Sequence, residues 1–355
     1  MATAADAEAE AAIGAAPTPP THAAADAGDE KADSLPLETR WPPFPLRRLG
    51  GFWIPEPLLP AVAAIHAGGK FVPTANDMLL ASFPKSGTSW LKALAFAVAN
   101  RADHPPSAAD HPLRRRSPHD LVNFFEMTTL TTMNSDDIAA VDDAPPPPRV
   151  LATHLPYSML PESITGGDGG GGCRIIYVCR NPKDTVVSFW HFSKKMALTM
   201  GVDPSSFTFD QAFDLFCSGN CTAGPQWRHV IEYWEASHHR NPNVLFLRYE
   251  EMLRRPAMSV RRMAEFMGCP FTAAEEDAGV VDAVVELCSI GELRKMEVNK
   301  KGTDVLGVRN ESYFRKGVAG DWVNHMSPEM AARLDRIVDD ATRGSGLTLT
   351  DSSVY

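Results

Sequence analysis

The residues of this sequence that are best suited to chemistry begin with the stretch at 83–90, Phe-Pro-Lys-Ser-Gly-Thr-Ser-Trp. An apolar run at 78–81 precedes it and is typical of a buried strand, and residues 91–98 follow it in a helical pattern. The first turn of a helix presents free N–H groups and about half a positive charge, and Lys85 adds a full charge beside it. A strand, a tight turn and a helix start in this order predict a binding site for phosphate or sulfate.

The small residues of this stretch support the same chemistry. Gly87 lets the backbone approach an anion closely, and Thr88 and Ser89 add hydroxyl donors. The stretch differs from the Walker nucleotide-binding pattern, in which a lysine directly follows the second glycine, because Lys85 precedes Gly87 by two positions. Simple capping of the helix would use the same residue types, so that alternative stays open for the loop considered alone.

Three further segments have the apolar, β-branched composition of buried strands, at residues 149–153, 174–179 and 244–249. A side chain that could act in a site stands at the end of each one: His154, Arg180 and Tyr249. A neutral histidine is a suitable general base near neutral pH, and a guanidinium is a suitable partner for a phosphate. As single residues, His154 and Arg180 would also fit structural roles at the ends of strands.

Helical patterns alternate with these strands, at residues 58–66, 183–194, 209–216, 227–234 and 256–267 and from residues 272 and 327 onward. This alternation predicts an α/β fold with a central parallel sheet flanked by helices, because parallel neighbours need a helical crossover. Ligands of such sheets bind outside the carboxyl ends of the strands. The candidate positions all lie at those ends, so we expect them to form one shared site.

Composition limits the partners of this chain of 355 residues. Its 44 acidic residues exceed its 34 basic ones, and the net charge of -10 argues against nucleic acid or an anionic membrane as a partner. An anionic ligand then needs a local pocket of positive charge. No uncharged apolar run reaches the length of about 18 residues that a membrane span needs. The six cysteines show no metal-ligand spacing and are expected to be free thiols in a reducing compartment.

The ends of the chain differ in composition from its middle. Residues 1–40 are rich in Ala, Asp, Glu and Pro and predict a disordered tail, since they offer little apolar surface to bury. The tail is too acidic for a transit peptide, so a cytoplasmic location is expected. One folded domain is expected at 41–345, with a short tail at 346–355. The aromatic, proline-rich segment at 41–55 would either pack in the core or wall a substrate pocket.

The order of Lys85, the hydroxyl residues and Trp90 resembles the 5′-phosphosulfate loop of the sulfotransferases that use 3′-phosphoadenosine 5′-phosphosulfate (PAPS). Residues 180–188 resemble the 3′-phosphate motif of that family, and residues 313–322 resemble the loop that closes over the same phosphate. The resemblance covers residues 79–322 and is greatest to the soluble plant members. It implies a single P-loop-like domain, PAPS as the donor and no metal.

The resemblance also implies which residues bind the donor and which act in catalysis. The expected donor-binding residues are Lys85, Ser86, Gly87, Thr88, Ser89, Trp90, Arg180, Ser188, Tyr249, Arg315, Lys316 and Gly317. Sulfuryl transfer, by analogy with phosphoryl transfer, depends on positioning and on neutralising the leaving oxygen. His154 is expected to be the general base and Lys85 to neutralise the leaving oxygen. Ser188 is expected to steer Lys85 between the 3′-phosphate and that oxygen.

The resemblance places the acceptor pocket at Phe124, Met127 and Phe192. These residues suit an apolar molecule that carries a hydroxyl group, such as a flavonoid, a steroid or a hydroxylated oxylipin. Two positions depart from the pattern of the animal relatives: Ala152 stands where many have a lysine, and Ile290 stands where they have an aromatic residue against the adenine. A C-terminal dimer signature of the family is absent, so the oligomeric state stays open.

Two alternative functions stay open beside this prediction. The absence of a lysine at Ala152 would fit a protein that binds the nucleotide but has lost catalysis. A P-loop phosphotransferase that uses ATP and magnesium would share the anion loop, but the sequence lacks the Walker order and an evident strand ending in a magnesium-binding Asp. The main prediction is a PAPS-dependent, metal-independent sulfotransferase that acts on a small hydroxylated molecule.

Overall fold

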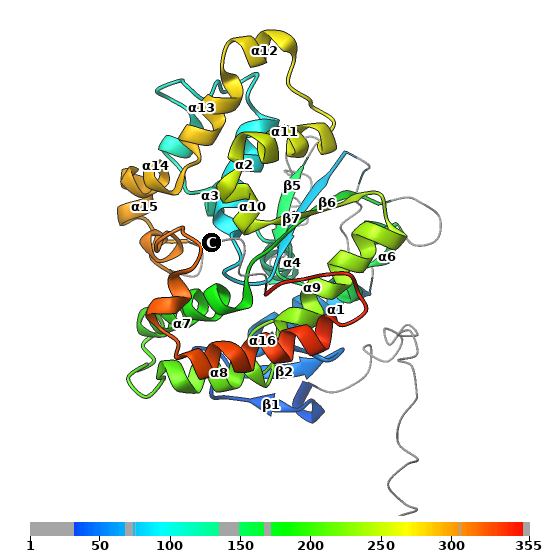
Figure 1. The fold of residues 1–355 in the computed structure, drawn as a ribbon, viewed down its shortest axis with the longest axis vertical. Coiled ribbons are helices and arrows are strands. Elements are labelled where there is room, and N and C mark those ends of the chain that lie inside the picture. The colour runs from blue at the N-terminus through cyan, green and yellow to red at the C-terminus, as the bar shows by residue number, and fades with distance from the viewer. Residues whose placement is uncertain are drawn as a thin grey trace, which may run out of the picture.

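A four-stranded parallel sheet forms the centre of the computed structural model, which describes residues 32–67, 74, 76–134, 149–166, 172–304 and 307–350 (Figure 1). The strands are β4 (Met78–Ser82), β5 (Val150–Thr153), β6 (Arg174–Cys179) and β7 (Val244–Arg248), in the order β5-β4-β6-β7. Leu80 of β4 lies between Ala152 of β5 and Ile176 of β6, and all three are fully buried. Burial on both faces explains the continuous apolar runs. The predicted α/β fold with a central parallel sheet is confirmed.

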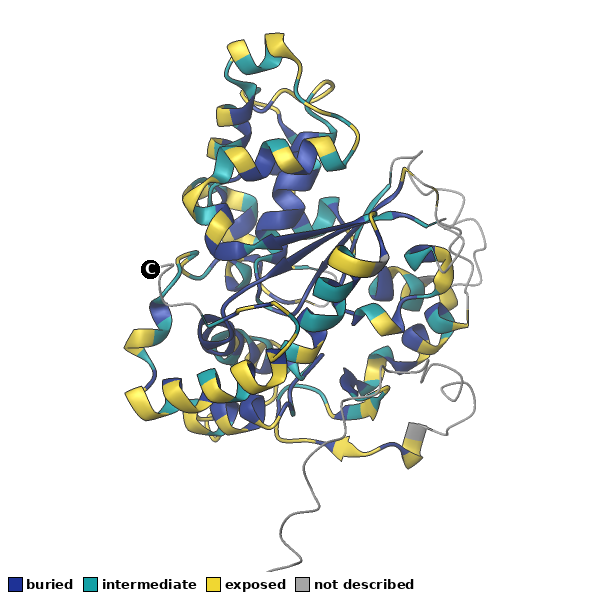
Figure 2. Cartoon of the chain, turned by 45° about the vertical axis from the view of Figure 1, so that its right-hand side comes forward, coloured by how far each residue is buried: buried dark blue, intermediate teal, exposed yellow. Residues whose placement is uncertain are grey.

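Helices cover both faces of this sheet. On one face lie α2 (Thr88–Ala99), α11 (Pro256–Phe266) and α13 (Val280–Leu287), and on the other lie α7 (Pro182–Thr199), α9 (Gln226–Glu235) and α16 (Pro328–Thr342). Successive strand residues alternate between the two faces, so Leu80 packs with the first group of helices and Leu79 with the second. Figure 2 shows the buried strands between helices whose outer faces are exposed. The strand ends that carry the candidate residues are therefore fixed by packing on both sides.

Further helices complete the domain. They are α1 (Leu59–His66), α3 (Pro118–Leu121), α4 (Phe125–Asn134), α6 (Glu162–Thr165), α8 (Phe209–Cys217), α10 (Tyr249–Arg254), α12 (Ala273–Asp277), α14 (Ile290–Lys295) and α15 (Glu297–Lys301). A capping box begins the helix predicted from residue 272, since the hydroxyl of Thr272 accepts from the N–H of Glu275 and the Glu275 carboxylate accepts from the N–H of Thr272. The helix predicted from residue 327 begins at Pro328, with Ser327 as its cap.

A small antiparallel sheet near the N-terminus was not predicted from the sequence. It consists of β1 (Leu37–Glu38), β2 (Leu46–Leu49) and β3 (Phe52–Pro55), in that order. Gly50 and Gly51 turn the chain between β2 and β3 with φ angles of +59° and +89°. Trp41 is buried, and its indole N–H donates to the hydroxyl of Ser193 on α7 at 3.1 Å. These contacts fasten the segment 41–55 to the domain, where part of it packs in the core.

Several predicted segments lie partly outside the described residues. Residues 1–31 of the predicted N-terminal tail are outside them, whereas Leu37–Glu38, near the end of that tail, forms β1. Leu347 and Leu349 of the predicted C-terminal tail are buried in the core. The predicted domain limits stay predictions. Among the described helices, none is long and apolar enough to cross a membrane.

Candidate functional site

The carboxyl ends of the parallel strands border one cavity of about 260 Å³. Its lining includes residues from every predicted motif: Lys85, Gly87, Thr88, Ser89, Trp90, His154, Arg180, Ser188, Tyr249, Arg315, Lys316 and Gly317. The predicted acceptor residues Phe124, Met127 and Phe192 line the same cavity. Ser86 is the one predicted residue that does not line it, because its side chain is fully buried. The fold therefore brings the predicted residues together at the expected edge of the sheet.

The loop between β4 and α2 turns sharply at two residues. Lys85 and Gly87 have φ angles of +66° and +115°, a region that favours glycine. Gly87 is also required by space, because a Cβ at this position would lie 2.7 Å from Cδ2 of Tyr249. The hydroxyls of Ser82 and Thr88 are hydrogen-bonded at 2.6 Å and join the end of β4 to the start of α2. The loop thus holds the helix start, with its positive end, at the cavity.

Lys85 lies in an apolar and cationic environment. Its Nζ is 4.0 Å from the ring centroid of Phe192 and 5.4 Å from that of Tyr313. Burial, and next the charge of Arg180, lower the pKa of Lys85 to about 7. An anion bound beside the lysine would raise this pKa again, so the charged lysine and an anionic ligand would stabilise each other.

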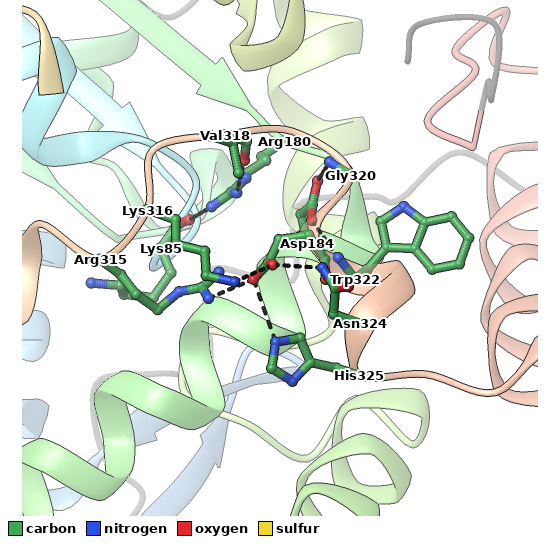
Figure 3. Close-up of polar contacts among 11 residues, drawn as sticks. Lys85, Arg180, Asp184, Arg315, Lys316, Val318, Gly320, Trp322, Asn324 and His325 are labelled. Carbon is green, nitrogen blue, oxygen red and sulfur yellow. Dashed lines mark hydrogen bonds and ion pairs between the residues drawn. The ribbon is translucent and has the colours of Figure 1, made fainter. Parts of the chain in front are cut away.

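Arg180 joins three segments of the chain at the cavity (Figure 3). Its guanidinium is buried and donates to the carbonyl oxygens of Val318 at 2.9 Å and Lys85 at 3.3 Å. Asp184, in the first turn of α7, accepts a hydrogen bond from the N–H of Gly320 at 2.7 Å. The loop that contains Val318 and Gly320 is therefore held against the start of α7, as the resemblance implied for a loop that closes over a phosphate.

Asp321 holds the two cations of that loop. Arg315 and Lys316 each lie 2.6 Å from its carboxylate, and their hydrogen bonds keep the pKa of Asp321 well below its usual range despite burial. Two buried guanidinium donors at the cavity have no hydrogen-bond partner among the described residues: Nε of Arg315 and Nε of Arg180. Buried polar groups are nearly always paired, so these donors fit a site that is completed by an anionic ligand.

His154 is held in one tautomer. Its Nδ1 lies 2.7 Å from the carbonyl oxygen of Ser82. Because a carbonyl oxygen only accepts, Nδ1 carries the hydrogen and Nε2 keeps its lone pair. Burial lowers the pKa of His154 to about 3, so the imidazole is neutral near pH 7. The backbone N–H of His154 donates to the carboxylate of Glu126 at 2.8 Å. The side chain can accept a proton from a group in the cavity.

Aromatic and apolar side chains border the other end of the cationic region. The rings of Trp90 and Tyr249 meet edge to face, with centroids 5.5 Å apart, and the guanidinium of Arg180 lies 4.7 Å from the centroid of Tyr249. A Cβ at Gly317 would lie 2.6 Å from Cγ1 of Ile290. A second cavity of about 360 Å³ opens here, lined in part by Trp90, Ile290 and Gly317. These surfaces suit a flat heterocycle.

The part of the main cavity beside His154 is apolar. Further apolar side chains join Phe124, Met127 and Phe192 there. They come from the N-terminal segment up to the start of α1 and from α4 and α7, namely Pro42, Pro43, Phe44, Pro55, Pro57, Leu58, Leu130, Phe189 and Met196. Both expectations for the segment 41–55 are met, because some of its residues pack in the core and others form this wall. One cavity is thus lined by two groups of residues, which we call its cationic half (Lys85, Arg180, Arg315 and Lys316) and its apolar half (the apolar residues above).

Three polar residues at the cavity were not singled out from the sequence. His119 lines the cavity, and its Nε2 lies 2.8 Å from the hydroxyl oxygen of Ser89. Lys92 is fully buried behind it, with Nζ 3.2 Å from Nδ1 of His119. Glu126 also lines the cavity, and burial raises the pKa of its carboxyl group. One indication of these three residues is visible in the sequence, which is the position of Lys92 within the otherwise apolar segment 91–98.

Comparison with known proteins decides the family. The model of the sulfotransferase domain matches residues 75–346. The chain belongs to the sulfotransferase family. Cytosolic sulfotransferase 15 of Arabidopsis thaliana is 41% identical over 321 residues, which cover 90% of this chain and 86% of the relative. Cytosolic sulfotransferase 5 of the same plant is 38% identical over 314 residues, which cover 88% of this sulfotransferase and 94% of the relative.

Solved structures agree with this assignment. A putative steroid sulphotransferase of Arabidopsis thaliana is 33% identical, with a TM-score of 0.67 and coverage of 89% of this sulfotransferase and 93% of that chain. A mouse sulfotransferase complexed with 3′-phosphoadenosine 5′-phosphate (PAP) is 25% identical, with a TM-score of 0.62. The match covers 84% of this sulfotransferase and 95% of the mouse chain. The predicted family, enzyme class and fold are confirmed, which decides against a P-loop phosphotransferase. The names of the plant relatives agree with the predicted cytoplasmic location.

Proposed function

We propose that this sulfotransferase moves the sulfuryl group of PAPS to a hydroxyl group of a small, largely apolar and uncharged molecule. The observation that carries the proposal is one cavity at the strand ends that is lined both by a cationic group and by an apolar group of residues. The mouse relative that was solved with PAP supports the choice of donor. The plant relative named as a putative steroid sulphotransferase supports an apolar acceptor.

The donor fits the polar groups that line the cationic half. The 3′-phosphate would be bound by Arg180, Ser188 and the loop at 315–317, and the 5′-phosphosulfate by the loop at 85–89. The aromatic surface of Trp90 would contact the adenine. The unpaired Nε groups of Arg180 and Arg315 would then gain partners, and the pKa of Lys85 would rise toward its usual value.

The proposed reaction forms a bond between the acceptor oxygen and sulfur and breaks the bond between sulfur and the 5′-phosphate oxygen. His154 takes the acceptor proton at Nε2, because the hydrogen bond from Nδ1 to Ser82 leaves that lone pair available. Lys85 neutralises the leaving phosphate oxygen as its charge develops. Ser188 steers Lys85 between the 3′-phosphate and that oxygen. The scheme uses no metal, and metal independence stays a prediction.

The apolar half of the cavity favours uncharged acceptors. Four of the described residues that line the whole cavity are lysine or arginine, and each belongs to one of the nucleotide motifs: Lys85, Arg180, Arg315 and Lys316. A free carboxylate on the acceptor would leave water without a partner, at a cost of several kcal/mol. The carboxyl group of Glu126 would add to that cost wherever it is ionised. Neutral flavonoids, steroids and hydroxylated oxylipins without a free carboxylate are therefore the proposed acceptor classes.

An assay with labelled PAPS against matched acceptor pairs tests the proposal. Each pair consists of a neutral phenol or alcohol and the same skeleton with an added carboxylate. We expect sulfation of the neutral member and little or none of the acid. Tight binding of PAP with no turnover across the panel would instead favour a nucleotide-binding protein without catalysis. Loss of turnover in EDTA would contradict metal independence.

A further inference from the structure

Three polar side chains form a chain that begins in the core and ends at the cavity. Nζ of the fully buried Lys92 lies 3.2 Å from Nδ1 of His119 and 3.4 Å from the ring centroid of Phe124. Nε2 of His119 lies 2.8 Å from the hydroxyl oxygen of Ser89, which lines the cavity. The imidazole ring also lies 4.0 Å from that of Tyr313, centroid to centroid. The ring of His119 is therefore fixed by a contact at each nitrogen and on its face.

The charge on Lys92 decides the direction of these hydrogen bonds. A protonated lysine only donates, so Nδ1 of His119 must accept and Nε2 must carry the hydrogen. Nε2–H then donates to the oxygen of Ser89, and the hydroxyl hydrogen of Ser89 is free to donate into the cavity. A neutral Lys92 allows the opposite direction, in which Ser89 donates to His119 and offers only lone pairs to the cavity. An anion would be repelled by the second arrangement.

The electrostatics of Lys92 link this direction to the ligand. Burial lowers the pKa of Lys92 to about 7, and the carboxyl group of Glu126 acts in the opposite direction. An anion at Ser89 would favour the charged lysine and so select the arrangement in which Ser89 donates to it. Burial, and to a smaller extent the charge of Lys92, lower the pKa of His154, so Lys92 also acts on the reacting end of the cavity.

We propose that Lys92 and His119 are positioning residues that fix the hydroxyl of Ser89 as a hydrogen-bond donor to the 5′-phosphate end of the donor nucleotide. This inference rests on the proposed position of the nucleotide. Lys92 supplies, from α2, a positive charge on the side of the site where Ala152 supplies none. The two positions are close, because Phe124, which Lys92 touches, pairs with Ala152 in a parallel bridge.

Binding of PAP, measured by calorimetry, tests the proposal with four variants. Ser89→Ala, Lys92→Met and His119→Phe should each weaken binding by roughly tenfold to a hundredfold, the value of one charge-assisted hydrogen bond. His119→Gln should retain most of the affinity, because its amide offers one acceptor and one donor in place of the two ring nitrogens. His111→Phe is the control, since His111 is a buried histidine that does not line the cavity. It should lower the thermal stability and leave the affinity for PAP unchanged.

A double variant separates the proposed chain from general damage. In the Ser89→Ala background, Lys92→Met should weaken binding clearly less than it does in the wild type, because the hydrogen bond that both changes remove is already lost. Two results would overturn this inference and leave the proposed function intact. One is that the losses of affinity from Ser89→Ala and Lys92→Met are additive. The other is that Lys92→Met binds PAP like the wild type while Ser89→Ala binds it weakly. If Ser89→Ala bound PAP normally, the proposed position of the nucleotide would fail with it. Where Lys92→Met does not fold, equal affinities of His119→Gln and His119→Phe would overturn the inference.

Discussion

Replacement of Gly87 by alanine tests how closely the anion loop and Tyr249 depend on each other. Gly87 has a φ angle of +115°, and an alanine there would cost about 1–3 kcal/mol in backbone strain. Its Cβ would lie 2.7 Å from Cδ2 of Tyr249, where ordinary contact begins at 3.4 Å, so the ring or the loop must move by the difference of 0.7 Å. The ring of Tyr249 supports both Arg180 and Trp90, so this shift would disturb the contacts proposed for the 3′-phosphate and the adenine.

We expect Gly87→Ala to weaken PAP binding by roughly tenfold to a hundredfold, equivalent to the loss of one charge-assisted contact of about 1.5–3 kcal/mol. Calorimetry would give the affinity, and thermal unfolding would give the stability. Gly201→Ala is the matched control, because Gly201 has a φ angle of +73° and nothing within 4 Å of a Cβ built there. That variant should lose stability from strain alone and keep its affinity. Wild-type affinity for PAP in Gly87→Ala would refute the inference that a Cβ at this position displaces Tyr249 and so disturbs the nucleotide site.

Three further predictions concern the proposed roles of single side chains. His154→Ala should lower turnover by about 10²- to 10⁴-fold with little change in PAP affinity, and the loss measured in initial rates should shrink for more acidic phenols. Arg180→Ala should weaken PAPS binding by one to two orders of magnitude and affect adenosine 5′-phosphosulfate, which lacks the 3′-phosphate, far less, as competition binding would show. PAP affinity should fall as the pH rises above about 7, because the pKa of Lys85 in the free protein is about 7 and its charge is then lost. Lys85→Met should make this fall shallower, with the remainder due to Lys92, whose pKa is also about 7; an equally steep pH profile in that variant would show that Lys85 does not contribute to it.

The main elements and the motif residues could be predicted because each depends on a local pattern. An apolar, β-branched run marks a strand that is buried on both faces, and the residue after it lies at the edge where parallel sheets bind ligands. Arg180 follows such a run, and Lys85 follows another, so the topology alone brings them to one cavity. Turn residues with a specific backbone requirement, such as Gly87, are also visible in a sequence.

The residues that the sequence did not reveal depend on packing between distant segments. His119 belongs to α3, a helix of four residues without a clear apolar period, and its role follows only from its contact with Lys92 and Ser89 of α2. The antiparallel sheet was missed because β1 has two residues and prolines interrupt the segment around it. That segment is ordered by long-range contacts, such as the one from Trp41 to Ser193.

Ser82, the last residue of β4, connects the two functions of the site. Its carbonyl oxygen accepts from Nδ1 of His154 at 2.7 Å, and its hydroxyl is hydrogen-bonded to that of Thr88, the first residue of α2, at 2.6 Å. The residue is fully buried at the end of a strand that has a neighbour on each side, so it has little freedom to move. Ser82 therefore fixes both the tautomer of His154, the proposed base, and the position of the start of α2. A sheet of this kind can thus keep a proton acceptor and an anion site in register without a direct contact between them.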